Sequence, residues 1–179
     1  MPDLSPPDRL AARLLRPGGA EVLDVMGPTI ALLTEPAPED SVPCVMQGTI
    51  PPGGVVPLHA HADPETFLAI EGEVEGLAEY PEGFRWVRIE PKEVFHVPGG
   101  AKHAFRNPTQ QTAVMIVVST SRLARFFREI GTPRPSGDGP PVRPGAERVR
   151  HFLDVAARYG YWNAGPEENA AVGISLPPV

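Results

Sequence analysis

Residues 53–65 read GGVVPLHAHADPE, a stretch in which two histidines are separated by one residue and a glutamate follows four residues later. Successive side chains of a β-strand point to opposite faces, so His59 and His61 on a strand point to the same side. Both imidazoles can then reach a single ion. Asp63-Pro64 indicates a bend that starts the next strand. An adjacent strand would bring the carboxylate of Glu65 to the same face.

A second stretch, PGGAKHAFRN at residues 98–107, offers a third imidazole, that of His103, directly after a tight turn. Three neutral imidazole nitrogens and one carboxylate oxygen suit Fe, Mn, Ni, Cu or Zn. The sequence therefore predicts one divalent transition-metal ion held by His59, His61, Glu65 and His103.

The segments around these two stretches are short and rich in β-forming residues. Pro and Gly separate them, and the chain holds 24 prolines and 18 glycines, a density that excludes a helical bundle over most of the length. We expect strands at 21–26, 29–34, 42–50, 65–70, 73–80, 84–89, 93–97 and 113–120. Strands at this regular spacing are typical of an antiparallel sandwich or barrel.

After residue 120 the apolar pattern becomes helical. Ser121 is the expected N-cap of a helix over 122–130, which Gly131 ends. A second helix is expected over 146–159, with Val149, Phe152, Leu153, Ala156 and Tyr159 as its apolar stripe. Residues 132–145 are expected to be an extended, mobile linker, and one or two helical turns are expected at 9–15.

No second hydrophobic core is evident in the 179 residues. We therefore expect residues 1–179 to form one domain, with a motif-bearing core of about 40–120 and a helical extension of about 121–179.

Composition narrows the possible partners and the compartment. The net charge is −6 with no basic block, which argues against a nucleic acid or an anionic membrane as partner. No apolar run is long enough to span a bilayer, and the first residues show no secretory signal. The single cysteine, Cys44, excludes an internal disulfide framework and is interpreted as a buried thiol. These features predict a cytoplasmic protein.

The two histidine-containing stretches resemble the two conserved motifs of the cupin superfamily. The first motif is Gly, five residues, His-x-His, three residues, Glu, six residues, Gly, and it is matched by Gly53, His59, His61, Glu65 and Gly72. The second is Gly, five residues, Pro-x-Gly, two residues, His, three residues, Asn, and it is matched by Pro98, Gly100, His103 and Asn107.

One motif position differs, because Lys92 stands where the second motif begins with Gly. We expect residues 90–93 to form a type I turn with Pro91 at its second position, which requires no positive φ of Lys92.

The resemblance implies an all-β fold with minor α content, a cupin β-barrel of the jelly-roll (double-stranded β-helix) type with the metal inside and helices at the C-terminus. It also implies two roles for Glu65, fourth metal ligand or catalytic base toward the substrate, and both stay open. By strand alternation, Phe67 and Ala69 share the face of Glu65, and Phe105 shares that of His103. These three are candidate pocket-lining residues, although ordinary barrel packing explains them equally well.

Other side chains are interpreted as structural. His96 is assigned a structural role and not that of a ligand, and Arg106 is expected to be a surface charge. Tyr159, Tyr161 and Trp162 are assigned to helix packing rather than to the mouth of the barrel.

The C-terminal run RFFREIG, a Pro-rich linker and the ending AARYGYW are similar to the tails of small bacterial single-domain cupins of the quercetin dioxygenase-like group. This similarity implies a metal-dependent dioxygenase acting on a small aromatic or enolic compound. Two alternatives stay open: a non-redox isomerase, decarboxylase or dehydratase, and a non-catalytic module that binds a metal and a ligand. The amphipathic helices and the β-rich N-terminal segment favour a homodimer.

Overall fold

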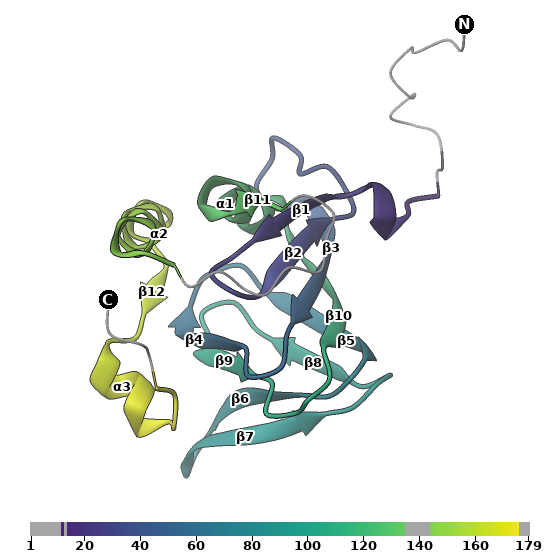
Figure 1. Ribbon diagram of the computed structural model, residues 1–179. Coiled ribbons are helices and arrows are strands. Elements are labelled where there is room, and N and C mark those ends of the chain that lie inside the picture. The colour runs from purple at the N-terminus through teal and green to yellow at the C-terminus, as the bar shows by residue number, and fades with distance from the viewer. Residues whose placement is uncertain (1–11, 13, 135–143, 176–179) are drawn as a thin grey trace, which may run out of the picture.

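The computed structural model describes residues 12, 14–134 and 144–175, and within them two antiparallel sheets form the body of the molecule, with helices on one side (Figure 1). The helical turns expected at 9–15 lie mainly outside the described residues. Where the described chain begins, Pro17–Gly19 form a single 3₁₀ turn, and Leu14 and Leu15 before it are not helical.

The described strands form sheets of seven and five members. The first sheet has the order β11-β1-β2-β3-β10-β5-β8, and the second has the order β12-β4-β9-β6-β7. Their bounds are β1 Glu21–Asp24, β2 Thr29–Leu32, β3 Pro43–Ile50, β4 Val55–Ala60, β5 Glu65–Glu71, β6 Val74–Tyr80, β7 Gly83–Ile89, β8 Val94–Val97, β9 His103–Arg106, β10 Ala113–Thr120, β11 Thr132–Pro133 and β12 Trp162–Asn163. The eight expected strands are all confirmed, and the predicted two-sheet all-β fold with them.

The core lies between the two sheets because each strand buries one alternating set of side chains. In β3 the side chains of Cys44, Met46 and Ile50 are buried while their neighbours are partly exposed. Phe67 of the first sheet meets Phe105 of the second with 4.5 Å between ring centroids. Cys44 is fully buried, as predicted, and burial raises the pKa of its thiol.

Helix α1 (Ser121–Ile130) follows β10 without a loop. Its N-cap is Thr120, whose Oγ1 accepts a hydrogen bond from the backbone N–H of Leu123 at 3.1 Å. The prediction of Ser121 as N-cap is therefore wrong by one residue. Ser121 is fully buried instead, and its hydroxyl accepts from the backbone N–H of Ala37 at 2.9 Å. Gly131 ends the helix as predicted.

Helix α2 (Ala146–Tyr159) packs against α1 through Phe126, Phe152 and Val155. The expected stripe is only partly correct, since Leu153 is 48% exposed while Val155 and Ala156 are buried. A short helix that the sequence did not predict, α3 (Pro166–Ala171), lies beside β4. None of the described helices is both long and apolar enough to cross a membrane.

The linker expected over 132–145 lies mostly outside the described residues. Its first residues belong to a sheet, because Thr132 and Pro133 pair with β1 as the short strand β11. The expectation that this region is mobile remains a prediction.

The turn between β7 and β8 differs from the prediction. The N–H of Glu93 donates to the carbonyl of Glu90 at 3.0 Å, which closes the expected four-residue turn, but Lys92 has a φ of 79°. A positive φ at the third residue of a turn, here Lys92 directly after Pro91, belongs to a type II turn, in which Gly is favoured at that residue. The type I prediction is therefore wrong. The backbone is held this way by β5, because Lys92 N–H donates to the carbonyl of Ala69 at 2.9 Å.

Replacing Lys92 by Gly should stabilise the protein. The left-handed conformation disfavours a side chain, and glycine removes that cost but adds freedom to the unfolded chain, so we expect a net gain of about 0.5–1 kcal/mol. Urea unfolding of Lys92→Gly, with Lys92→Ala as control, measures it. The alanine variant loses the lysine side chain but keeps the unfavourable φ, and an equal gain in both variants would contradict the conformational explanation.

Candidate metal centre

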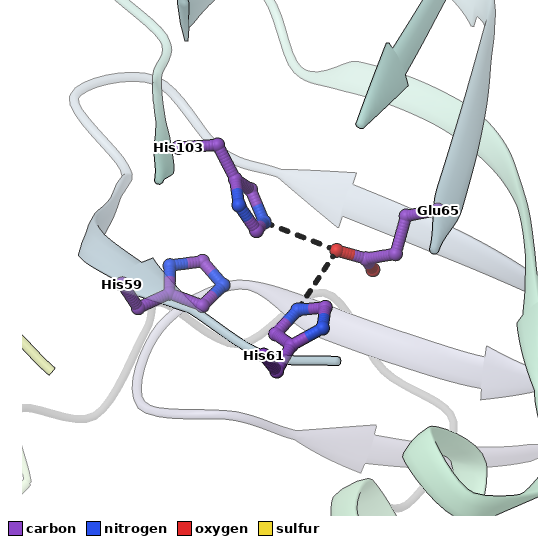
Figure 2. A group of neighbouring side chains, drawn as sticks. All are labelled: His59, His61, Glu65 and His103. Atoms are coloured by element: carbon purple, nitrogen blue, oxygen red, sulfur yellow. Dashed lines mark hydrogen bonds and ion pairs between the residues drawn. The ribbon is translucent and has the colours of Figure 1, made fainter. Parts of the chain in front are cut away.

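Two of the four candidate ligands lie on paired strands of the five-stranded sheet. His59 near the end of β4 and His103 at the start of β9 are direct partners in the antiparallel register. Their ring centroids are 4.1 Å apart. The third histidine, His61, follows the end of β4 and turns to the same side, with its ring centroid 5.4 Å from that of His59 (Figure 2). The expected common face of His59 and His61 is confirmed.

Glu65 reaches the histidines from the other sheet. It is the first residue of β5, which pairs with β8 and β10. The expectation that Glu65 lies on a strand adjacent to β4 is therefore wrong. The corner at Asp63-Pro64 carries the chain from one sheet to the other. The carboxylate therefore faces the imidazoles across the interior of the barrel, as Figure 2 shows.

The four side chains converge closely and away from water. One oxygen of Glu65, Oε2, lies 3.1 Å from Nε2 of His61 and 3.1 Å from Nε2 of His103. Each of the four residues, His59 included, offers one ligand atom, and all these atoms lie within 4.8 Å of one another. His61, Glu65 and His103 are buried, whereas His59 is half-buried.

A second set of contacts fixes which nitrogen of each histidine carries the hydrogen when the ring is neutral. The Nδ1 atom of each ring lies against a backbone carbonyl: that of Pro57 for His59 (2.8 Å), Asp63 for His61 (2.8 Å) and Ala101 for His103 (3.0 Å). A carbonyl oxygen only accepts, so each Nδ1 must carry the hydrogen. In the neutral ring Nε2 then holds a lone pair, which is the form that binds a metal.

The convergence of unprotonated atoms requires a positive charge between them. Lone pairs on Nε2 of His61 and His103 face a carboxylate oxygen in a buried site, and without a shared proton or a cation these acceptors repel one another. The residues therefore fit a transition-metal ion, by the chemistry of the donors and by the hydrogen bonds that orient them.

In the metal-free protein, protons partly take over this role. Burial disfavours the ionised carboxylate of Glu65, but hydrogen bonds from His103 and His61 outweigh it and lower its pKa. Burial likewise opposes the charged form of His61, yet the hydrogen bond and the negative charge of Glu65 raise its pKa. The two shifts are consistent with one ion pair, Glu65 with a protonated His61.

His59 behaves in the opposite way. Loss of hydration, together with the positive charges that His103 and His61 can carry, lowers its pKa from 6.5 to about 3. It therefore stays neutral at physiological pH, with its Nε2 lone pair available.

Backbone turns hold the ligands in place. Gly100 N–H donates to the carbonyl of His61 at 2.7 Å. A side chain on Gly99 would place its Cβ 2.3 Å from the carbonyl oxygen of Ala62, so only glycine allows the two loops to meet. Asn107, fully enclosed, donates through its side chain to the carbonyls of Ile50 and Gln111 and has a structural role.

The remaining candidates fall outside the cluster. Phe67, Ala69 and Phe105 are buried in the core between the sheets, and their lining of a substrate pocket remains a prediction. His96 is exposed and contacts Thr66, so it lies apart from the cluster.

Arg106 was expected to be a surface charge, but its side chain is half-buried. Its Nε donates to Glu75 at 2.5 Å, and its guanidinium lies over the ring of Trp86 at 4.1 Å.

Tyr161 is the site neighbour that sequence reasoning missed. It lies beyond α2 and is 8% exposed, and its ring centroid is 5.1 Å from that of His61. Its hydroxyl donates to Oδ2 of Asp63 at 2.6 Å. Asp63 was interpreted only as part of a bend, and no spacing in the sequence links residue 63 to residue 161.

Two cavities are present elsewhere on the described surface. The larger, of about 510 Å³, lies on the outer face of the five-stranded sheet between Trp86, Trp162 and α3. The smaller, of about 300 Å³, lies beside Asp63, Arg122 and Tyr159. The ligand cluster lines neither of them, and the side of the cluster that solvent reaches is that of half-buried His59.

Comparison with known proteins places this geometry in a recognised fold. Residues 46–119 match the sequence profile of the cupin domain family, a segment that includes all four cluster residues. The comparison with curated protein sequences returns no match.

Solved structures with a similar fold are distant in sequence. The polyketide cyclase RemF from Streptomyces resistomycificus is 17% identical, with 81% of this chain and 99% of that one covered at a TM-score of 0.53. An RmlC-like cupin from Shewanella frigidimarina is 16% identical, with 62% and 92% covered at 0.51. A formate complex of oxalate decarboxylase from Lactobacillus farciminis is 20% identical, with 63% and 34% covered at 0.50.

The chain therefore has a cupin fold, and the family profile and the structures together support the cupin superfamily. The chain spans about a third of the length of the oxalate decarboxylase that it matches.

The stability of the metal-free protein should fall as the pH is lowered from about 6.5 towards 3. In that window the unfolded chain protonates His59 and the folded chain does not, so protonation favours unfolding. His59→Gln removes this titration, and its free energy of unfolding should depend less steeply on pH. Urea unfolding in the presence of a chelator, at several pH values across the window, measures both proteins.

The comparison between the two proteins isolates His59, because both keep His61 and Glu65, whose shifted pKa values also make the stability depend on pH. The raised pKa of His61 contributes stability below its ordinary pKa, and this contribution is lost as the pH rises. Equal slopes for the parent and the variant would contradict the lowered pKa of His59.

Proposed function

We propose that the chain is a metal-dependent dioxygenase that acts on a small aromatic or enolic compound. His59, His61, His103 and Glu65 would hold one ion of Fe, Mn, Ni, Cu or Zn, and the dioxygenase reaction calls for one of the redox-active members of that set. The bound metal would supply a site at which an oxygen-bearing substrate is held and electrons are exchanged with O₂.

One observation carries the metal-dependent part of the proposal. All three histidines donate from Nδ1 to carbonyl oxygens, so three Nε2 lone pairs and a carboxylate oxygen meet within 4.8 Å. Neutral Nε2 ligands oriented by outer hydrogen bonds are the usual form of a metal-binding histidine.

The geometry favours the ligand role for Glu65 over the role of base. Its two imidazole contacts lower the pKa of its carboxyl, and a strongly acidic group is a weak general base near neutral pH. As a ligand, the carboxylate neutralises part of the charge of the ion. The base role remains an alternative, because a substrate bound beside Glu65 would change its surroundings.

The barrel interior would protect the reaction from water. Phe67, Ala69 and Phe105 are buried in the core, with the ring of Phe105 6.3 Å from that of His103 and the ring of Phe67 4.5 Å from that of Phe105. An apolar wall of this kind suits an aromatic or enolic substrate better than a charged one. Entry would occur on the side of His59, the half-buried ligand.

A non-redox reaction is the second candidate, and one observation favours it. The match to the polyketide cyclase RemF covers 81% of this chain and so extends beyond the cupin profile over residues 46–119. In an isomerase, decarboxylase, dehydratase or cyclase the metal would only polarise a substrate oxygen, and Zn would serve. A binding module without turnover is the third. A homodimer and a cytoplasmic location remain predictions.

Removal of two ligands should abolish metal binding. Protein purified without added metal should contain a near-stoichiometric transition metal, and the double variant His59→Ala/His61→Ala should contain little, because two of the four ligand atoms are gone. His96→Ala is the matched control, since His96 is exposed and contacts Thr66 instead of the cluster. Elemental analysis measures all three proteins. A double variant that keeps its metal would contradict the assignment.

The reaction class is tested by O₂ uptake with a panel of flavonols, catechols and β-diketones. Near-stoichiometric Fe, Ni, Mn or Cu together with substrate-dependent O₂ consumption is the expected result. Bound Zn without O₂ uptake would favour the non-redox enzyme or the binding module. No metal, even after reconstitution, would overturn the metal-dependent function in all its forms.

A further inference from the structure

The strand that carries two of the ligands is covered along its outer edge by the C-terminal segment 161–174, which we call the clasp. On one edge β4 pairs with β9, and on the other it pairs with β12, where Asn163 lies opposite His59 and Trp162 opposite Ala60. Just beyond β12, Ala164 N–H donates to the carbonyl of Leu58 at 2.9 Å. Figure 1 shows β12 and α3 beside β4, away from the rest of the sheet.

Asn169 anchors the clasp immediately before His59. It is fully buried, and its Oδ1 accepts the backbone N–H of Leu58 at 3.0 Å. Its Nδ2 donates to the carbonyls of Ala164 and Gly165 at 3.0 and 3.1 Å. A fully satisfied buried amide of this kind holds both segments that it joins.

Tyr161 anchors the clasp immediately after His61. Its hydroxyl donates to Oδ2 of Asp63, which also accepts from Arg122 at 3.0 Å, while Thr120 donates to Oδ1. The backbone carbonyl of the same Asp63 accepts from Nδ1 of His61 at 2.8 Å. The side chain of Asp63 is thus held by the C-terminal half of the chain, and its main chain orients a ligand.

We propose that Tyr161 and Asn169 are positioning residues for the metal centre, so that the clasp sets metal affinity from outside the cupin motifs. The two contacts lie on either side of the His-x-His pair. This inference rests on the proposed metal site, since His59 and His61 are the groups that are positioned. Neither residue is one of the four candidate ligands, and each would act through the backbone that carries one.

Tyr161→Phe tests the inference, with Tyr159→Phe as the matched control. Both variants remove one hydroxyl from the same aromatic cluster, but the Tyr159 hydroxyl bonds Glu129 and not Asp63. Outer hydrogen-bond partners of metal ligands affect affinity by about 10–100-fold, and this contact lies one step further out, so we expect about 3- to 10-fold weaker binding. The control should bind as the parent does. Competition with a chromophoric chelator for Co²⁺ measures the three affinities.

Two further measurements separate positioning from general stability. At saturating Co²⁺ the visible spectrum of Tyr161→Phe should differ from that of the parent, because a reoriented His61 changes the ligand field, while Tyr159→Phe should leave it unchanged. Thermal unfolding of the metal-free proteins reports stability alone. Should Tyr161→Phe not fold, Asn169→Ala removes the other anchor of the clasp, the acceptor of the Leu58 N–H, and should weaken Co²⁺ binding in the same way.

The outcomes distinguish this inference from the proposed function. A parent protein that binds no Co²⁺ would overturn the metal site and the clasp role with it. A parent that binds Co²⁺, with Tyr161→Phe equal to it in affinity and spectrum, would overturn the positioning role of Tyr161 and leave the metal site standing. The positioning role is supported if Tyr161→Phe binds Co²⁺ more weakly than the parent and has an altered spectrum, while Tyr159→Phe matches the parent in both.

Discussion

The structure depends on a buried convergence of hydrogen-bond acceptors that only a positive charge makes favourable. His59 and His103 each donate from Nδ1 to a carbonyl two residues earlier, and His61 donates to one two residues later. These short local bonds turn all three Nε2 lone pairs inward, toward the carboxylate of Glu65. Burying such a set without a cation is unfavourable.

The two sheets are arranged to bring these four groups together. His59 and His103 meet through strand register in one sheet, whereas Glu65 comes from the other sheet after a two-residue corner. A flat sheet would have placed the carboxylate beside the histidines; the barrel places it opposite them, which encloses the space between. Gly99 completes the enclosure, because it lies too close to the carbonyl oxygen of Ala62 for any side chain.

Much of this arrangement could be predicted because it depends on local periodicity. Alternation placed His59 and His61 on one side, and turn residues marked the eight strands. The errors occurred where a tertiary contact decides the local structure. β5 holds Lys92 in a left-handed conformation, and the burial of Ser121 against Ala37 leaves capping to Thr120. Tyr161 packs against the helices as predicted, but its second contact, to Asp63, was missed because the two residues lie 98 positions apart in the chain.

The contacts that hold His59 and His61 from outside come in part from residues beyond the motif-bearing core. Any chain with the two motifs can assemble three histidines and a glutamate, so the ligand set carries little information about the reaction. What the motifs do not specify is how tightly each ligand is held and from which direction. Here His59 and His61 are held by the clasp and by α1 through Asp63, while Glu65 and His103 are held within the barrel. The two pairs of ligands can therefore respond separately to changes in the chain. Changes in the elements packed outside β4 are therefore expected to alter how His59 and His61 are held without replacing a ligand.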